Sequence, residues 1–152
     1  MKLVLNIDRT FTDTKITIES PELDKNVQDI IDFIHKTDIE FLVGKRGEMQ
    51  HILKPEEIHY FHTEKEQVMA VTKNGSFTLK EKLYELEALL PSNEFIRLSK
   101  SVIANLHELS RFEASFNGTL CVYFKSGAKE YVSRTYVPMI KEVLKLNRRK
   151  VE

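Results

Sequence analysis

Short apolar runs separated by very short turns are the feature of this sequence that most constrains its fold. Asn74-Gly75 and Asn117-Gly118 each lie between two runs of β-branched and aromatic residues, and Gly47 and Gly127 occupy similar places. Asn-Gly in this setting is a strong β-hairpin signal. Strands joined by two or three residues must be antiparallel. The sequence therefore predicts a mainly β protein of antiparallel sheets with a few helices, an α+β fold.

Apolar residues at helical spacing predict helices over residues 20–37, 78–90 and 135–150. Thr78 and Glu81 form a T-x-x-E capping box, which indicates that the second helix begins there. The order of elements shows no alternation of strand and helix of the kind that builds a doubly wound parallel sheet.

The first forty residues have a different texture from the rest of the chain. Residues 2–7 and 15–18 read as two short strands, and the helix over residues 20–37 follows them. We therefore divide the chain into an N-terminal β-β-α extension, residues 1–40, and a main domain, residues 41–152. Forty residues rarely bury enough surface to fold alone, so the extension should pack on the main domain or on a second copy and serve dimerisation or input.

Several classes of chemistry find no support in the sequence. It contains no apolar run long enough for a membrane span and no phosphate-binding or nucleophile-elbow motif. His59 and His62 point to opposite faces of a predicted strand, which disfavours a metal site. The single cysteine, Cys121, lies in a predicted strand and suits a reducing cytoplasm. We expect a cytoplasmic protein that is not an enzyme and has no cofactor or metal.

Charge is divided unevenly along a chain that is neutral overall. Residues 95–152 hold eleven Lys or Arg against five Asp or Glu, a net charge of +6, and the remaining residues carry −6. This asymmetry fits a C-terminal half that faces an anion. The alternative is a solvated basic tail, because four of the eleven cations lie in the last eight positions.

Three segments in order resemble a known family. They are the hairpin and helix of "EEIHYFHTEKEQVMAVTKNGSFTLKEKLYELEALLPSNEF", then "FIRLSKSVIANLHEL", then "NGTLCVYFKSGAKEYVSRTYVPMIKEVL". Together they resemble the LytTR-type DNA-binding domain over roughly residues 45–146. Any single piece, such as "VSR", is weak, but the ordered set is specific. The matching positions are Phe95, Arg97, Ser101, Asn105, Leu106, Gly127, Val132, Ser133, Arg134, Tyr136 and Leu144.

The resemblance implies an elongated set of antiparallel sheets that reads the major groove of double-stranded DNA with loops between strands. Carried over by position, the loops are residues 63–67, 99–101 and 133–135. The DNA-binding residues that it implies are Lys65, Gln67, Arg97, Ser99, Lys100, Ser101, Ser133 and Arg134. Arg97 takes a second rank, as a structural or phosphate-facing residue. Taken without the family pattern, Lys100 would read as a lysine in a solvated turn. Asn105 and Tyr136 are assigned to structure.

This chain departs from the family pattern in two respects. The family carries His followed by Arg or Asn ahead of the motif serine, whereas Ser99 and Lys100 stand here. About forty residues precede the module, too few for a receiver domain, so we expect a stand-alone regulator that phosphorylation does not switch. The family's paired target repeats imply a homodimer, and a stand-alone regulator implies a regulatory partner protein, for which a membrane protein is our guess. The alternative function is a protein-interaction or ligand-sensing module that does not bind DNA.

Overall fold

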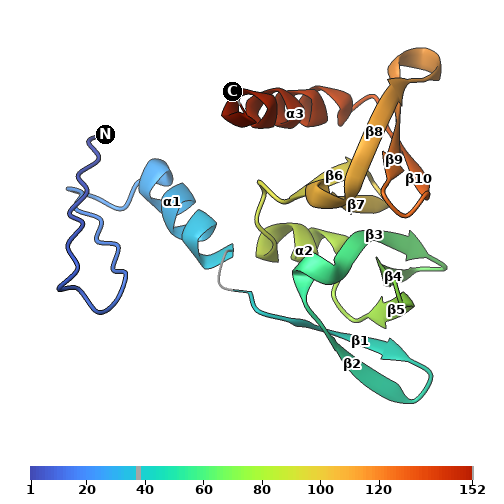
Figure 1. The fold of residues 1–152 in the computed structure, drawn as a ribbon, viewed down its shortest axis with the longest axis horizontal. Coiled ribbons are helices and arrows are strands. Elements are labelled where there is room, and N and C mark those ends of the chain that lie inside the picture. The colour runs from blue at the N-terminus through green and yellow to red at the C-terminus, as the bar shows by residue number, and fades with distance from the viewer. Residues whose placement is uncertain (37–38, 152) are drawn as a thin grey trace.

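Two antiparallel sheets form the body of the protein (Figure 1). The computed structural model describes residues 1–36 and 39–151, and the side chains of the basic tail after Lys145 lie outside this description. The larger sheet has the strand order β2-β1-β5-β4-β3-β7-β6, and the smaller one has the order β10-β9-β8. The elements are α1 (Lys25–Lys36), β1 (Leu42–Arg46), β2 (Met49–Leu53), η1 (Pro55–Glu57), β3 (Ile58–Glu64), β4 (Gln67–Thr72), β5 (Gly75–Leu79), α2 (Leu83–Leu89), β6 (Phe95–Ser99), β7 (Val102–Asn105), η2 (Leu106–Glu108), β8 (Leu109–Ala114), η3 (Phe116–Gly118), β9 (Leu120–Phe124), β10 (Lys129–Val132) and α3 (Val137–Val151).

The predicted hairpins at Gly47, Gly75, Gly118 and Gly127 all form, and the mainly β antiparallel fold is confirmed. In the turn between β8 and β9, Asn117 and Gly118 have φ values of 56° and 77°. The connection has five residues and contains the 3-10 turn η3, and Asn and Gly are the two residue types that adopt positive φ at the lowest steric cost.

The hairpin of β6 and β7 lies between two hydrophobic cores. Phe95 and Ile103 pack into the first core, which α2 covers, whereas Leu98 and Val102 pack into the second, which β9 and α3 cover. Successive residues of a strand point to opposite faces, so a strand buried on both faces reads as a continuous apolar run. All four residues of β7 are buried for this reason.

The helix α2 begins later than its sequence pattern predicts. Thr78 and Leu79 belong to β5, where they pair with Met69 and Val68 of β4. The helix starts at Leu83, and its first turn is closed by Glu85, whose carboxylate accepts a hydrogen bond from the backbone N–H of Lys82 (3.1 Å). The pairing with β4 outweighs the local capping box, which corrects the predicted start at Thr78.

The N-terminal extension lacks the two predicted strands. Residues 1–24 contain no strand and are exposed, and α1 begins at Lys25 rather than near Ser20, with Asp24 accepting a hydrogen bond from the N–H of Val27 (2.9 Å). Figure 1 shows this segment beside α1 and apart from the two sheets. The physical reason is that two short strands without a third strand or a covering layer are marginal in water.

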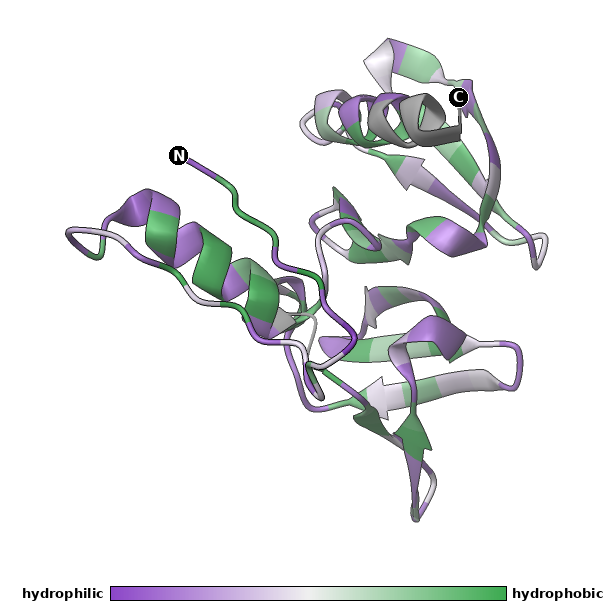
Figure 2. Ribbon diagram, turned by 60° about the vertical axis from the view of Figure 1, so that its left-hand side comes forward, coloured by the Kyte–Doolittle hydropathy of each residue, from purple (hydrophilic) through white to green (hydrophobic). Residues whose placement is uncertain are grey.

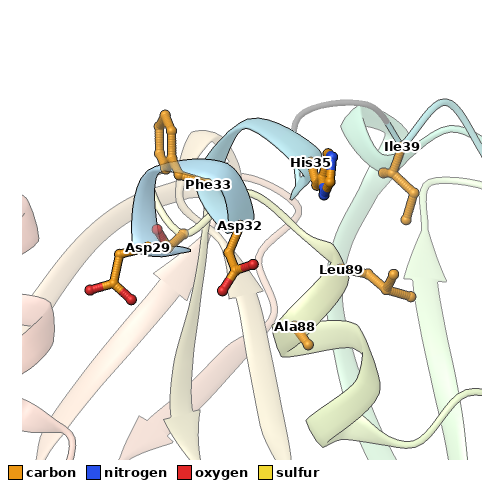
Figure 3. A pocket seen from close by; sticks show the side chains of 8 residues that line it. Asp29, Asp32, Phe33, His35, Ile39, Ala88 and Leu89 are labelled. Atoms are coloured by element: carbon orange, nitrogen blue, oxygen red, sulfur yellow. The ribbon is translucent and has the colours of Figure 1, made fainter. Parts of the chain in front are cut away.

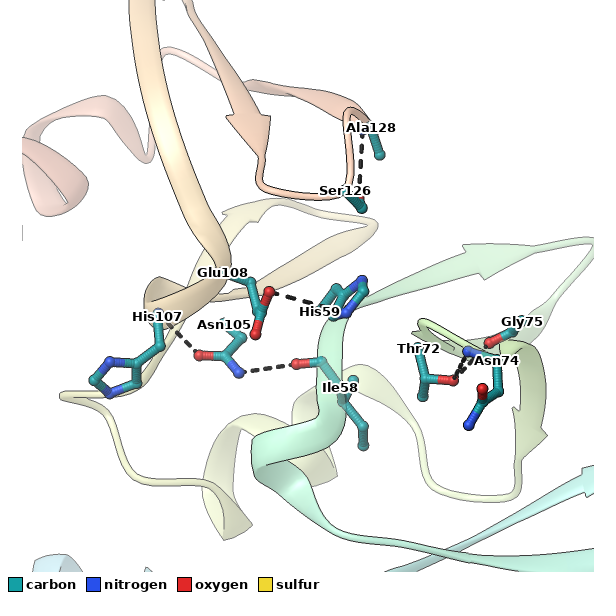
Figure 4. A network of polar contacts seen from close by, with 10 residues as sticks. All are labelled: Ile58, His59, Thr72, Asn74, Gly75, Asn105, His107, Glu108, Ser126 and Ala128. Carbon is teal, nitrogen blue, oxygen red and sulfur yellow. Dashed lines mark hydrogen bonds and ion pairs between the residues drawn. The ribbon is translucent and has the colours of Figure 1, made fainter.

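A buried asparagine fixes the junction between β7 and the following turn (Figure 4). Asn105 is 1% exposed, and its Nδ2 donates to the carbonyl oxygen of Ile58 (2.9 Å). Its Oδ1 accepts from the backbone N–H of His107 (3.0 Å). This confirms the expected structural role of Asn105 and ties the end of β7 to the start of β3.

We expect Asn105→Ala to lower the free energy of unfolding by about 2–3 kcal/mol, because the buried carbonyl oxygen of Ile58 and the partly buried N–H of His107 lose their partner. Urea unfolding followed by circular dichroism measures the change. His107→Ala is the control: its side chain is exposed and its N–H remains, so the loss should stay below about 0.5 kcal/mol. Equal losses in the two variants would contradict this role.

Candidate nucleic-acid interface

The three loops implied by the sequence lie next to one another. Because β3 pairs antiparallel with β7, the turn between β6 and β7 lies beside the end of β3, and the N–H of Thr63 donates to the carbonyl oxygen of Ser101 (2.9 Å). The N–H of Ser133 donates to the carbonyl oxygen of Leu98 (3.0 Å). These two hydrogen bonds place the loop that follows β6 beside the end of β3 and beside the loop that follows β10. We call the three loops together the loop surface.

Most of the implied DNA-binding side chains on the loop surface reach solvent. Five of them are exposed, and three are half-buried. The exposed ones are Lys65, Gln67, Lys100, Ser101 and Arg134, and the half-buried ones are Arg97, Ser99 and Ser133.

The turn between β6 and β7 presents Lys100 at its apex. Ser99 Oγ accepts a hydrogen bond from the N–H of Ser101 (3.2 Å), and the two serine hydroxyls lie 3.3 Å apart. A serine whose hydroxyl accepts a hydrogen bond from the backbone N–H two residues later stabilises a turn, and the strand pairing ends there. The ammonium group of Lys100 is therefore held outward on an ordered support.

Arg97 holds this turn from behind. Its Nε and Nη2 donate to the carbonyl oxygens of Ser99 and Lys100 (2.7 Å each), and its Nη1 donates to the carboxylate of Glu87 on α2 (2.8 Å). The planar guanidinium suits this fixed fork of acceptors, which an ammonium does not match. These contacts make Arg97 a positioning residue for Lys100.

The turn between β3 and β4 is tight and carries mixed charge. Lys65 and Glu66 occupy it with φ values of 50° and 66°, although neither is glycine, and Glu64 and Gln67 form the last pair before it. The loop thus offers one cation and one amide among two carboxylates. Phosphate binding by this loop depends on Lys65 and Gln67, because carboxylates repel phosphate.

Arg134 brings a fourth turn to the loop surface. A Cβ atom placed on Gly118 would lie 3.5 Å from Cδ of Arg134, so the stem of this arginine runs along the backbone of the turn between β8 and β9. Sequence reasoning identified Asn117-Gly118 as a hairpin turn but missed its place beside Arg134. No local signal relates these two segments, which the fold alone brings together.

A half-buried polar cluster lies where the two sheets meet. Burial raises the pKa of the Tyr60 phenol, and Glu130 reinforces the shift. Burial also raises the pKa of the Glu130 carboxyl, which His62 partly offsets. The Tyr60 ring lies 5.6 Å from the His62 ring and 4.7 Å from the Phe124 ring, so β3 and β9 meet through aromatic packing here.

Comparison with known proteins assigns the family. The model of the LytTr DNA-binding domain matches residues 48–145, which is more than half of the chain and includes every residue of the three loops. The chain belongs to the LytTr DNA-binding domain family. The match leaves out α1 and everything before it.

Individual proteins are also similar to this chain. The chain is 37% identical over 147 residues to an uncharacterized HTH-type transcriptional regulator of Staphylococcus aureus strain NCTC 8325 / PS 47. The aligned region covers 96% of this chain and 99% of the relative. A protein of the same description from strain MRSA252 is 36% identical over the same length. Among solved structures, the LytTr DNA-binding domain of a protein described as a methyl-accepting/DNA response regulator of Bacillus cereus matches with a TM-score of 0.67 and 21% identity. The structural match covers 70% of this chain and 97% of that domain, and it shows that the two share a fold.

The helix-turn-helix in the names of these relatives has no counterpart in the described part of this LytTr chain. There, α1 is followed by two strands, α2 by β6, and α3 by no further helix. The recognition unit of a helix-turn-helix protein is a pair of consecutive helices joined by a short turn. In this chain Lys65 and Lys100 lie on turns between strands, and Arg134 lies on the connection from β10 to α3, which corrects the expectation that all three loops join strands.

A cleft of about 660 Å³ between α1 and α2 is a second candidate site (Figure 3). Its lining combines apolar Phe33, Ile39 and Leu89 with the carboxylates of Asp29 and Asp32. Carboxylates disfavour a phosphate backbone, so this cleft does not suit nucleic acid. The LytTr loop surface is therefore the candidate interface.

The described residues show no assembly of metal ligands or membrane-spanning helix. No group of three or more His, Cys, Asp or Glu in this part of the chain could hold a metal ion. His51 packs on Phe77 with the ring centroids 4.8 Å apart, and His59 lies 3.9 Å from the carboxylate of Glu108, so the histidines serve separate contacts. None of the helices described is long and apolar enough to cross a bilayer.

We expect Arg97→Met to lower the free energy of unfolding by about 2 kcal/mol, because the variant keeps the aliphatic stem and loses the hydrogen bonds of the guanidinium. Urea unfolding and hydrogen exchange at the N–H of Thr63 and Ser101 measure the effect. Lys100→Met removes a cation from the exposed apex and should leave both readouts unchanged. If both variants behave like the wild type, Arg97 does not position the turn.

Glu130→Gln should stabilise the protein at pH 8. The pKa of this carboxyl is raised in the folded state, so deprotonation opposes folding and the neutral amide avoids that penalty. As the pH falls through the raised pKa towards the ordinary carboxyl pKa of about 4.3, the wild type becomes neutral and the difference should vanish. Thermal unfolding at pH 8 and at a pH near the ordinary carboxyl pKa tests this. A variant that is less stable than the wild type at pH 8 contradicts it.

Proposed function

We propose that this chain is a sequence-specific transcription regulator that reads the major groove of double-stranded DNA with the loop surface. The observation that carries the proposal is the pair of backbone hydrogen bonds that gathers three loops, one from Thr63 to Ser101 and one from Ser133 to Leu98. Lys100 and Arg134 stay exposed on the loops so gathered. The family assignment over residues 48–145 supports the same function.

The side chains of the loop surface have the donors that duplex recognition requires. An arginine fork pairs with guanine O6 and N7, and a lysine donates to the same atoms or neutralises a phosphate. We assign base contacts to Arg134 and Lys100, and phosphate contacts to the hydroxyls of Ser99, Ser101 and Ser133. We assign Lys65 and Gln67 to an adjacent base or phosphate. Arg97 acts chiefly by positioning the turn, with a phosphate contact as its secondary role.

The assembly that we propose is a homodimer on two half-sites, acting in the bacterial cytoplasm, where the DNA is. The paired sites implied for the family support the homodimer. The homologues from Staphylococcus aureus support the bacterial setting. A regulatory partner protein that supplies the input is part of the same proposal, and a membrane protein is our candidate for it. The protein has no catalytic role in this scheme.

We expect Lys100→Ala and Arg134→Ala each to weaken binding to a specific site by about 1–3 kcal/mol, because each removes donors to a base edge. A selection from random duplexes first supplies the site, and titration by fluorescence anisotropy measures affinity. Substitution of a residue that contacts only phosphate weakens binding to all DNA sequences alike and reduces the salt dependence of log K by about 1.

Lys73→Ala is the matched control for these variants. Lys73 is an exposed turn lysine at the end of β4 that is remote from Lys65. It should bind the selected duplex like the wild type. If Lys100→Ala and Arg134→Ala also bind normally, and wild-type affinity barely depends on salt, the loop surface is not the DNA interface.

A further inference from the structure

Two segments of the N-terminal extension have self-complementary patterns. Residues 2–8 read Lys-Leu-Val-Leu-Asn-Ile-Asp, and residues 15–19 read Lys-Ile-Thr-Ile-Glu. Each begins with a cation, ends with an anion and alternates apolar residues between them. An antiparallel partner of identical sequence places the cation opposite the anion and apolar residues opposite each other. We call these segments the first and second arms.

The arms are open in the single chain. Leu3, Leu5 and Ile7 of the first arm are 83%, 72% and 90% exposed, and Ile16 of the second is 64% exposed. Among the described residues, no backbone hydrogen bond pairs the two arms. A local turn does reverse the chain after the first arm, because Asp8 Oδ1 accepts hydrogen bonds from the N–H and the hydroxyl of Thr10 (2.9 Å each).

Apolar exposure is concentrated in this part of the molecule. Ten of the twenty exposed large hydrophobic residues of the described chain lie in residues 1–36, which are about a quarter of its length. Figure 2 shows apolar stretches along the arms and on α1. A concentration of exposed apolar side chains of this kind marks an interaction surface, in contrast to the scattered single residues that are normal on a monomer.

We propose that the first arm pairs antiparallel with the first arm of a second copy of this chain, centred on Leu5. In this register Leu5 faces Leu5 of the partner copy, Leu3 faces its Ile7, and Lys2 faces its Asp8. A two-fold axis through this point gives both copies the same contacts, as an isologous dimer requires. The proposal rests on the homodimer proposed above and adds its interface.

The second arm completes the sheet from each side. Folding back over the turn at Asp8, it sets Ile18 opposite Leu3 and Ile16 opposite Leu5, so the apolar residues of both arms share one face. Two arms from each copy make four strands, enough for a stable sheet when helices cover it. The α1 helices supply that layer through their apolar stripe of Val27, Ile30, Ile31 and Ile34, which a single chain leaves only half-buried.

The test uses full-length variants and mass measurement in the absence of DNA. Analytical ultracentrifugation over a micromolar concentration range should find the wild type at twice the chain mass. Leu5→Lys places two ammonium groups opposite each other at the two-fold axis, so its dimerisation should weaken at least tenfold. Val4→Lys, on the other face of the same strand, is the matched control and should remain dimeric. Circular dichroism and thermal unfolding verify that both variants fold.

A cross-link tests the register itself. In a Cys121→Ser background, cysteines at Val4 and Asn6 of opposite copies face each other, so the Val4→Cys/Asn6→Cys variant should form a covalent dimer under mild oxidation. Val4→Cys alone has no facing cysteine and should stay largely uncoupled. A monomeric wild type, equal effects of Leu5→Lys and Val4→Lys, or no cross-link from the double variant overturns the proposal.

DNA binding separates this proposal from the preceding one. A monomeric Leu5→Lys variant that still binds one half-site supports both. If the arms behave as proposed but Lys100→Ala binds DNA like the wild type, the DNA interface fails and the dimer interface stands. A monomeric wild type whose Lys100→Ala variant loses DNA affinity gives the reverse result.

Discussion

The structure depends on the burial of one hairpin between two cores. β6 and β7 direct Phe95 and Ile103 to one core and Leu98 and Val102 to the other, so the hairpin cannot shift register without exposing apolar residues to solvent. The only polar stretch of this hairpin, from Ser99 to Ser101, must then emerge at its turn. A lysine between two serines inside an apolar segment follows directly from this constraint.

Both ends of this hairpin are fixed by side chains that bond to backbone. Asn105 ties one end to Ile58, and Arg97 closes the other end by binding two carbonyl oxygens of the turn. Backbone acceptors do not change with the bases of the target, so this support is independent of the DNA sequence. In the proposed interface, Lys100 and Arg134 therefore work from a preorganised surface, which reduces the ordering that binding requires.

The sequence predicts what is local and misses what is distant. The turn at Asn117-Gly118 was predictable because its two positive φ angles depend on two neighbouring residues. The start of α2 was not, because Thr78 forms a capping box in sequence but pairs with Met69 in space. The alternating patterns of the N-terminal arms predict strands, but whether such strands form depends on a third strand or a covering layer, which the local pattern does not encode. Within the single chain the arms stay unpaired.

The same division holds for the loop surface. Lys100 was identified through an ordered family pattern, but its neighbours were not, because the contacts join Thr63 to Ser101 and Leu98 to Ser133 across more than thirty residues of chain. The positioning role of Arg97 likewise depends on Glu87, which comes from a different element. Such contacts follow from the pairing of β3 with β7, from the packing of α2 on β6 and from the contact between the two sheets, and no period in the sequence encodes them.

Electrostatics makes the proposed pairing of two chains important for function. The chain is neutral overall, and the loop between β3 and β4 carries two carboxylates beside Lys65, so a single copy exerts little long-range attraction on a phosphate backbone. Its affinity must come from a few short-range contacts at the gathered loops. Joining two copies turns the second binding step into an intramolecular one at high effective concentration, which multiplies the contribution of those few contacts. The N-terminal dimerisation element that we propose, outside the part that matches the family, would provide this gain without occupying the loop surface.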